Sequence, residues 1–258
     1  MSLSDQSAEP DDVSGSILLS IVVPTFNEAA SVAPLRVEID AAMADAPYSW
    51  EAVWIDDGST DETSRELRDF DAPHRYLRFE QNCGQSAALM AGIYAARGEW
   101  VGTLDGDGQN DPQDLPRQLT FALEAGLDMV NGIRAKRNDS LVRRVSSRLA
   151  NGYRRRLLKD GVTDVGCSTR VVRRAMLSNL PFFDGIHRYL PALVAMRGGT
   201  MGEIPVNHRP RTAGKSKYGI RNRLWVGLQD VRGVRWLRDR NRRWTIIEQT
   251  PDRDQECG

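Results

Sequence analysis

The stretch Trp100–Pro112 reads WVGTLDGDGQNDP, and its order of elements decides the fold class. The run Trp100–Leu104 is short and apolar, as is typical of a buried strand. The polar residues that follow form a turn, and Pro112 opens a segment with helical periodicity that continues through Glu124. A strand, a polar turn and a helix in this order predict an alternating α/β architecture.

The same alternation extends in both directions along the chain. Further strands are predicted over Ile17–Val23, Glu51–Ile55, Arg75–Phe79 and Leu127–Asn131. Helices are predicted over Ala29–Ala46, from a cap at Ser59 or Thr60 through Leu67, and over Gln85–Ala96. In the less regular second half we expect helices over Asn138–Lys159 and Ile186–Met196, a strand or extended loop over Val165–Val172, and a strand over Met201–His208. The pattern predicts a mostly parallel sheet with helices on both faces and a C-terminal helical appendage.

The chain divides into three regions by composition. Residues 1–16 are rich in Ser and Asp and are predicted to be a disordered tail. Residues 17–218 carry the alternating pattern and are predicted to form one α/β domain. Residues 219–258 are rich in Trp and Arg, and we expect a basic helical tail with a frayed end.

Charge is balanced overall but unevenly distributed. The 258 residues contain 35 Lys and Arg against 35 Asp and Glu, which excludes a simple polycation. The segment Arg134–Arg156 nevertheless carries nine bases against the single acid Asp139, and Arg221–Trp244 carries eight arginines against two aspartates. Most bases in such runs lie on solvated helix faces, but two concentrated segments also indicate anionic partners at defined places.

Cysteine usage and hydropathy narrow the class of protein further. Cys83, Cys167 and Cys257 are far apart without CxxC spacing, so neither a disulfide framework nor a zinc site is predicted. The sequence contains no run of about 20 apolar residues and begins with an acidic, polar stretch. We therefore expect a protein of the reducing cytoplasm, either soluble or resting on a membrane surface.

Polar clusters follow three of the predicted strands. They are Pro24–Glu28, Asp56–Asp61 and Asp105–Pro112. Any one of them alone is compatible with an ordinary turn and helix cap, since Asp, Ser, Thr and Gly are favoured there. Ligands of open α/β sheets bind at the carboxyl ends of the strands, so three clusters at that edge predict a binding site.

The cluster after the fourth strand has the most specific chemistry. Asp105 and Asp107 flank Gly106, and two carboxylates in this arrangement suit a hard divalent cation that also holds phosphates. Gln109 adds a neutral oxygen donor. The spacing does not match an EF-hand, because Asn110 stands where that loop needs glycine, and no G-x-G-x-x-G follows the first strand.

Together these motifs resemble family 2 glycosyltransferases with the GT-A (Rossmann-like) fold, and within them the polyprenyl-phosphate branch typified by dolichol-phosphate mannose synthase. The resemblance covers about Ile17 to Tyr218. The matching motifs are Val23–Glu28, Asp56–Asp61, Asn82–Gln85, Asp105–Gln109, Asp111-Pro112 and Arg211–Lys217. Two features depart from this branch: many of its members carry C-terminal membrane helices, and Phe26 stands where Tyr is common.

The resemblance implies a role for each matching position. Pro24, Phe26, Glu28 and Asp57 would line the nucleotide base and ribose. Asp105, Asp107 and Gln109 would hold Mg²⁺ or Mn²⁺ against the donor diphosphate, with Asp107 and Arg211 as the residues expected to carry catalysis. The remaining assignments are Arg211 and Lys217 at the donor phosphates and Arg134 and Arg148 at the acceptor phosphate.

The implied reaction is a metal-dependent, inverting transfer of a sugar from a GDP- or UDP-sugar to a polyprenyl phosphate. Such a transfer develops negative charge on the leaving group, which a divalent cation and Arg or Lys stabilise. The acceptor phosphate is already ionised, so no general base is needed. Consistently, the sequence offers only the single carboxylates Asp164 and Asp184 where a base would be sought.

Several alternatives stay open from the sequence. The same fold transfers sugars to hydroxyls of glycans or proteins, which would depend on Asp164 or Asp184. A non-catalytic sugar-nucleotide-binding or membrane-scaffold protein is a second alternative, and nucleic-acid binding lacks any recognised motif. The tail is expected either to lie at a membrane interface, on the cytoplasmic face, or to pack on its own domain. A separate membrane-anchoring protein is a further candidate partner, and His187-Arg188 either borders the acceptor site or begins a helix.

Overall fold

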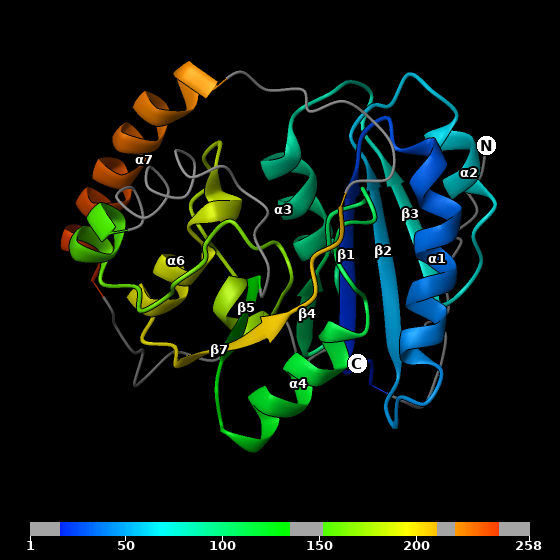
Figure 1. Cartoon of the computed structure of the whole chain (residues 1–258), viewed down its shortest axis with the longest axis horizontal. Coiled ribbons are helices and arrows are strands. Elements are labelled where there is room, and N and C mark those ends of the chain that lie inside the picture. Colours follow the sequence, from blue (N-terminus) through cyan, green and yellow to red (C-terminus); the bar gives the residue numbers. More distant parts are fainter. Residues whose placement is uncertain (1–15, 135–151, 211–219, 243–258) are drawn as a thin grey trace, which may run out of the picture.

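The computed structural model describes residues 16–134, 152–210 and 220–242. Its centre is a seven-stranded sheet in the order β3-β2-β1-β4-β6-β5-β7 (Figure 1). Only β6 runs antiparallel to its neighbours β4 and β5 among the described strands, and the other pairs are parallel. The strands are β1 Leu19–Thr25, β2 Trp50–Asp56, β3 His74–Arg78, β4 Trp100–Thr103, β5 Met129–Arg134, β6 Arg170–Arg173 and β7 Met201–Val206.

Helices cover both faces of this sheet, as the sequence predicts. They are α1 Ala29–Met43, α2 Thr63–Arg68, α3 Gln85–Ala95, α4 Asp114–Glu124, α6 Leu190–Met196 and α7 Ile220–Arg240, with 3₁₀ turns at Arg174–Leu177 and Ile186–Arg188. Side chains alternate along β1, so Leu19, Ile21 and Val23 pack with α1, α2 and α4, whereas Val22 packs with α3 and α6. Burial of these two apolar layers, rather than helix propensity, holds the sheet between its helices.

The helix α7 forms the predicted C-terminal helical element and lies beside α6 (Figure 1). Its buried residues Val231 and Val234 belong to a small apolar cluster with Leu158, Tyr189 and Ala192. The face of α7 that carries Val231 and Val234 therefore packs on its own domain. The predicted boundary at residues 218–219 falls within the stretch 211–219, outside the described residues.

One local prediction was wrong, and a second was correct except for an interruption. Neither Ser59 nor Thr60 caps the helix after β2, which begins at Thr63 with Asp61 Oδ1 accepting the Thr63 N–H at 3.0 Å. The predicted helix Ile186–Met196 is interrupted at Tyr189, and α6 begins next to Pro191, whose missing N–H suits a helix start.

Two other predictions are tested only in part. The segment Val165–Val172 becomes a strand only from Arg170 onwards. In the predicted helix Asn138–Lys159, residues 135–151 lie outside the described residues and 152–158 are helical. The predicted tail at residues 1–16 also lies outside the described residues, apart from Ser16.

Candidate functional site

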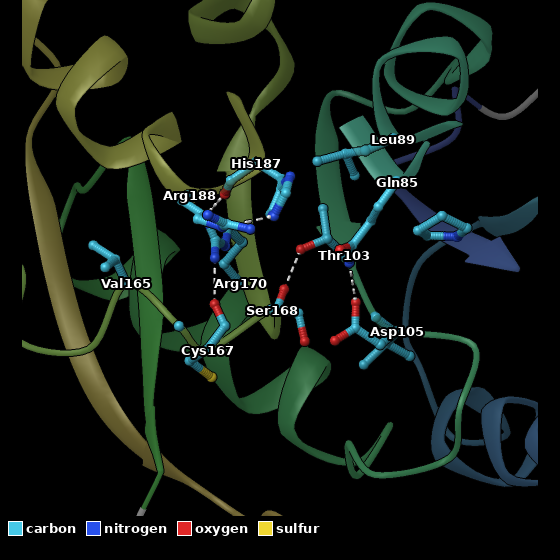
Figure 2. Close-up of a pocket in the computed structure, with 13 residues that line it drawn as sticks. Gln85, Leu89, Thr103, Asp105, Val165, Cys167, Ser168, Arg170, His187 and Arg188 are labelled. Atoms are coloured by element: carbon cyan, nitrogen blue, oxygen red, sulfur yellow. Dashed lines mark hydrogen bonds between the residues drawn. The ribbon is translucent and has the colours of Figure 1, made fainter. Parts of the chain in front are cut away.

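A cavity of about 290 Å³ opens at the carboxyl ends of the parallel strands (Figure 2). Its size is close to the lower end of the range of roughly 300–1,000 Å³ that is usual for small-molecule sites. Residues from both halves of the chain line it, including Pro24, Gln85, Asp105, Ser168, Arg170, His187 and Arg188. Among the predicted site residues, Pro24 and Asp105 therefore face the same cavity.

The turn after β4 is held tightly against the neighbouring strand. A Cβ atom on Gly106 would lie 2.5 Å from Thr25 Cγ2 and 2.9 Å from the Pro24 carbonyl oxygen, so only glycine fits there. Asn110 Oδ1 accepts hydrogen bonds from the Asp105 N–H at 3.1 Å and from Ser168 Oγ at 3.0 Å. The backbone that carries the two predicted metal-binding carboxylates is thereby fixed from both sides.

The carboxylates of this turn form an electrostatically unfavourable pair. Burial raises the pKa of Asp105, and the negative charge of Asp107 raises it further, although Ser168, Arg170 and Gln85 act in the opposite direction. Gln85 Nε2 donates to Asp105 Oδ1 at 2.8 Å. A divalent cation relieves the repulsion between two such carboxylates, so the donor set fits a hard cation.

These carboxylates fit a metal ion that is bound jointly by the protein and a ligand, rather than one bound by protein side chains alone. No group of three or more His, Cys, Asp or Glu side chains arranged for metal binding occurs in the parts of the chain that the structure describes. Mg²⁺ is commonly held by one or two carboxylates plus substrate phosphates. Asp105 and Asp107 therefore suit a cation that completes its coordination with a diphosphate.

The turn after β2 has a different construction. Asp57 is buried, and its Oδ1 accepts the Cys83 N–H at 2.6 Å while its Oδ2 accepts the Gly84 N–H at 2.9 Å and Asn82 Nδ2 at 2.8 Å. Burial raises the pKa of Asp57, and these backbone hydrogen bonds lower it. The observed role of Asp57 is to hold the loop that leads into α3, and its contact with a nucleotide stays a prediction.

Side chains of the same turn also fix the loop after β1. Asn27 adopts a positive φ of 53°, its N–H donates to Ser59 Oγ at 2.9 Å, and its Oδ1 accepts the Thr60 N–H at 2.8 Å. The Glu28 N–H donates to Thr63 Oγ1 at 2.8 Å. The two predicted nucleotide-binding loops are thus one hydrogen-bonded unit, on which Phe26 and Glu28 are partly buried.

The predicted acceptor arginine Arg134 lies at the end of β5 in a two-pronged ion pair. Its Nε and Nη2 each lie 2.8 Å from an oxygen of Asp164, whose side chain is only 7% exposed. Arg134 therefore neutralises a buried carboxylate in this structure. Arg148, Arg211 and Lys217 lie outside the described residues.

Sequence reasoning missed residues at the other side of the β4 turn. His208 pairs with Asn110 in an antiparallel bridge, and Arg209 and Gln109 exchange hydrogen bonds of 2.8 and 3.2 Å. Gln109 Nε2 donates to the Arg209 carbonyl, and the N–H of Gln109 donates to Asp107 Oδ1 at 3.1 Å. The expected strand Met201–His208 was the only signal that brought this segment to the site.

Arg170 was missed as well. It is 3% exposed, and its guanidinium donates to the carbonyl oxygens of Cys167 and, at 2.9 Å, of His187. Burial lowers the pKa of Arg170, and the thiol of Cys167 together with the nearby carboxylates opposes that shift. The available signal was an arginine that directly precedes the two valines Val171 and Val172 of a predicted strand.

The carboxylate turn thus lies at the carboxyl edge of a mostly parallel sheet in an α/β fold, beside a cavity that two arginines also line. Residues 20–180 match the family described as Glycosyl transferase family 2, and the chain belongs to this family. The prediction of family 2 membership is therefore confirmed.

Two curated relatives show how the similarity extends along the chain. A dodecaprenyl-phosphate galacturonate synthase from Rhizobium johnstonii is 39% identical over 212 residues, which cover 80% of this chain and 63% of that protein. An undecaprenyl-phosphate 4-deoxy-4-formamido-L-arabinose transferase from Edwardsiella ictaluri is 36% identical over 208 residues, 78% of this chain and 63% of the relative. The chain thus spans less than two thirds of the length of these relatives.

Solved structures confirm the predicted GT-A fold. A mannosyl-3-phosphoglycerate synthase from Rubrobacter xylanophilus is 20% identical with a TM-score of 0.65, covering 89% of this chain and 77% of its own. A glucosyl-3-phosphoglycerate synthase from Mycobacterium tuberculosis in complex with Mg²⁺ and uridine diphosphate is 19% identical with a TM-score of 0.63, covering 86% and 79%. None of the helices in the described part of this chain is long and apolar enough to span a membrane.

Proposed function

We propose that this protein transfers a sugar from a nucleotide-diphosphate donor to a polyprenyl phosphate in a metal-dependent, inverting reaction. The observation that carries the proposal is the cavity in which Asp105 of the β4 turn and two arginines, Arg170 and Arg188, line one space. A cation-binding end and an arginine-lined end suit a reaction between two phosphate-bearing substrates. The curated relatives, whose names specify prenyl-phosphate acceptors, support the same choice.

Asp105 and Asp107 would hold Mg²⁺ or Mn²⁺, with Gln109 as a neutral donor beside them. The bound ion would neutralise charge on the donor diphosphate as the nucleotide leaves. The bridge to Asn110 places the backbone of His208 beside this turn, so His208 is an additional candidate donor. Holding the turn rigid keeps these groups in place without reorganisation during the reaction.

The acceptor phosphate would supply the nucleophile directly. One of its oxygens forms a bond to the anomeric carbon while the bond from that carbon to the diphosphate breaks, and the nucleoside diphosphate departs. No proton has to be removed from an ionised phosphate. In keeping with this, Asp164 is engaged by Arg134, and Asp184 Oδ1 accepts a hydrogen bond from Ser86 Oγ at 3.2 Å.

The hydrogen-bonded loops after β1 and β2 would form the binding site for the nucleotide-sugar donor. Pro24, Phe26, Glu28 and Asp57 are proposed to lie near the base and ribose. We expect a UDP-sugar, because solved structures of the same fold contain uridine diphosphate. Arg211 and Lys217 are proposed for the donor phosphates and Arg148 for the acceptor.

We further propose that the protein works peripherally at the cytoplasmic face of a membrane, where a prenyl phosphate is accessible. Trp236 on α7 is 58% exposed, and the guanidinium carbon of Arg240 lies 4.8 Å from its ring centroid. An exposed tryptophan beside arginines suits lipid head groups. A separate membrane-anchoring protein is a further candidate partner.

The test is transfer of label from a panel of UDP- and GDP-sugars, including UDP-galacturonate, to a short prenyl phosphate with Mn²⁺. The expected product is a prenyl phosphosugar, formed with release of the nucleoside diphosphate. The corresponding prenol serves as the control acceptor, and Asp107→Asn as the control protein. Transfer to a soluble glycan but not to prenyl phosphate would contradict the proposal.

A further inference from the structure

The side chains of Ser86, His187 and Arg188 are joined by hydrogen bonds at the edge of the cavity. Ser86 lies in the first turn of α3, and His187 and Arg188 lie on the 3₁₀ turn Ile186–Arg188. Ser86 Oγ lies 2.9 Å from His187 Nδ1 and 3.2 Å from Asp184 Oδ1. Arg188 Nε donates to His187 Nε2 at 3.3 Å, as Figure 2 shows for the residues that line the cavity.

The direction of each hydrogen bond follows from the donors available. Arg188 Nε can only donate, so His187 Nε2 accepts and the imidazole proton sits on Nδ1. That proton is donated to Ser86 Oγ, whose own hydroxyl proton is then free to go to Asp184. Ser86 Oγ also accepts the Gly185 N–H at 2.8 Å, which completes its hydrogen bonding.

This arrangement requires a neutral imidazole, and the surroundings keep it neutral. Burial, together with the positive charges of Arg188 and Arg170, lowers the pKa of His187 to about 3, against the smaller opposing effect of Asp184. His187 therefore stays a hydrogen-bond acceptor for Arg188 throughout the neutral pH range. The hydrogen bond to His187 therefore orients the guanidinium of Arg188 through Nε and does not use its two terminal nitrogens.

The hydrogen bond to His187 uses only Nε of Arg188, and the charge of Arg188 also interacts electrostatically with Asp230 of α7. The terminal nitrogens of Arg188 make no hydrogen bond or ion pair within the described parts of the chain, although Arg188 lines the cavity. Figure 2 shows Arg188 and Arg170 on one side of the cavity and Asp105 on the other. A guanidinium held at Nε with open terminal nitrogens is arranged to bind an anionic oxygen group.

The geometry of an in-line displacement indicates which anionic group Arg188 would bind. The attacking and leaving oxygens must lie on opposite faces of the anomeric carbon. The leaving diphosphate is assigned to the Asp105 side, so the attacking phosphate belongs on the Arg188 side. Arg134, the arginine expected there from sequence, is occupied by Asp164.

We propose that Arg188 binds the phosphate of the prenyl acceptor, and that Ser86 and His187 are positioning residues that aim its guanidinium. The inference rests on the proposed function, and it adds a specific acceptor ligand to it. It also gives a role to the hydrogen bonds that join Asp184, the buried Ser86 and the neutral His187 beside the cavity.

The test separates acceptor from donor binding. Kinetics with a short prenyl phosphate and the active UDP-sugar are measured for wild type, Arg188→Gln, Ser86→Ala, His187→Ala and His187→Gln. We expect Arg188→Gln to raise the acceptor KM about 10- to 100-fold, as loss of charge-assisted hydrogen bonds does, with the donor KM unchanged. His187→Ala and Ser86→Ala should raise it less, and His187→Gln, which keeps an acceptor for Arg188 Nε, should recover part of the loss.

The matched control is Arg65→Gln on α2, because the Arg65 side chain is 80% exposed and does not line the cavity. Equilibrium binding of the prenyl phosphate to protein with UDP and Mn²⁺, compared with the prenol, gives a second readout without turnover. Binding that is equal in wild type and Arg188→Gln, or a rise in the donor KM instead, would overturn the inference. Absence of transfer by wild type, with phosphate-dependent binding that Arg188→Gln weakens, would instead count against the proposed function.

Discussion

The turns after β2 and β4 are both rich in aspartate and lie at the same edge of the sheet, yet the protein uses them differently. After β2, Asp57 accepts three hydrogen bonds from the loop 82–84. After β4, Asp105 and Asp107 face each other's negative charge beside a cavity. Burial and a neighbouring carboxylate, Asp56 or Asp107, raise the pKa of both Asp57 and Asp105. The opposing hydrogen bonds come from the backbone N–H groups of Cys83 and Gly84 for Asp57, and from the side chains of Ser168 and Gln85 for Asp105.

The comparison teaches that the partners of a carboxylate, rather than its place in a turn, decide its role. A carboxylate that accepts protein hydrogen bonds fixes structure, as Asp57 and Asp164 do. Two neighbouring carboxylates beside a cavity, such as Asp105 and Asp107, suit a divalent cation.

The largest effect is expected for Asp107→Asn. Loss of one carboxylate should lower transfer about 10²- to 10³-fold, because charge on the leaving group is no longer neutralised. The melting temperature should stay the same or rise, since the repulsion with Asp105 is relieved. Initial rates and thermal unfolding are compared with those of Asp45→Asn, which changes an exposed aspartate near the end of α1. A large loss of stability would place Asp107 among the structural carboxylates instead.

The second-largest effect is expected on the free energy of unfolding. Arg134→Gln leaves the buried Asp164 without its ion-pair partner and should lower the free energy of unfolding by about 3 kcal/mol. Urea denaturation measures this loss. The double variant with Asp164→Asn should recover part of it, because the unpaired charge is gone. Full stability of Arg134→Gln would show that the ion pair contributes little.

A smaller loss is expected when the β2 turn is opened. Asp57→Ala removes the acceptor of three hydrogen bonds and should cost about 2 kcal/mol of stability. Hydrogen exchange should locate the change at the N–H groups of Cys83 and Gly84. The exposed Asp69→Ala serves as the control, and unchanged protection in the 82–84 loop would be inconsistent with the role given to Asp57.

The smallest effect is expected at Glu51, which lies at the opposite end of β2 from Asp57. It concerns how the stability of the protein depends on pH. Burial disfavours ionised Glu51, but hydrogen bonds from Ser20, the Arg97 N–H and Arg75 outweigh it and lower its pKa. Its stabilising contribution is therefore present above the ordinary glutamate pKa and is lost as the pH falls through the lowered value. Glu51→Gln should cost about 1 kcal/mol at neutral pH and should flatten the acid limb of stability against pH. A curve that matches wild type would contradict this account.

The fold could be predicted because apolar runs, polar turns and helical periodicity alternate through β4 and α4. The antiparallel pairing of β6 with β4 and β5 could not be predicted in the same way, because it joins segments far apart in sequence. For the site, the Asp105-Gly106-Asp107 turn carries its chemistry locally, and the sequence identified it. The hydrogen-bond partners of Asp57 and Arg134 and the chain from Ser86 to Arg188 depend on tertiary contacts, which local patterns do not encode.

Titration of Mn²⁺ in the presence of UDP tests most directly whether the β4 turn binds the cation and the β2 turn does not. Calorimetry would compare wild type with Asp107→Asn and with Asp61→Asn, a change in the β2 turn at a residue whose Oδ1 accepts the Thr63 N–H. The account predicts UDP-dependent Mn²⁺ binding that Asp107→Asn weakens at least about tenfold and Asp61→Asn leaves unchanged. Undiminished binding by Asp107→Asn, or loss of binding only in Asp61→Asn, would contradict it.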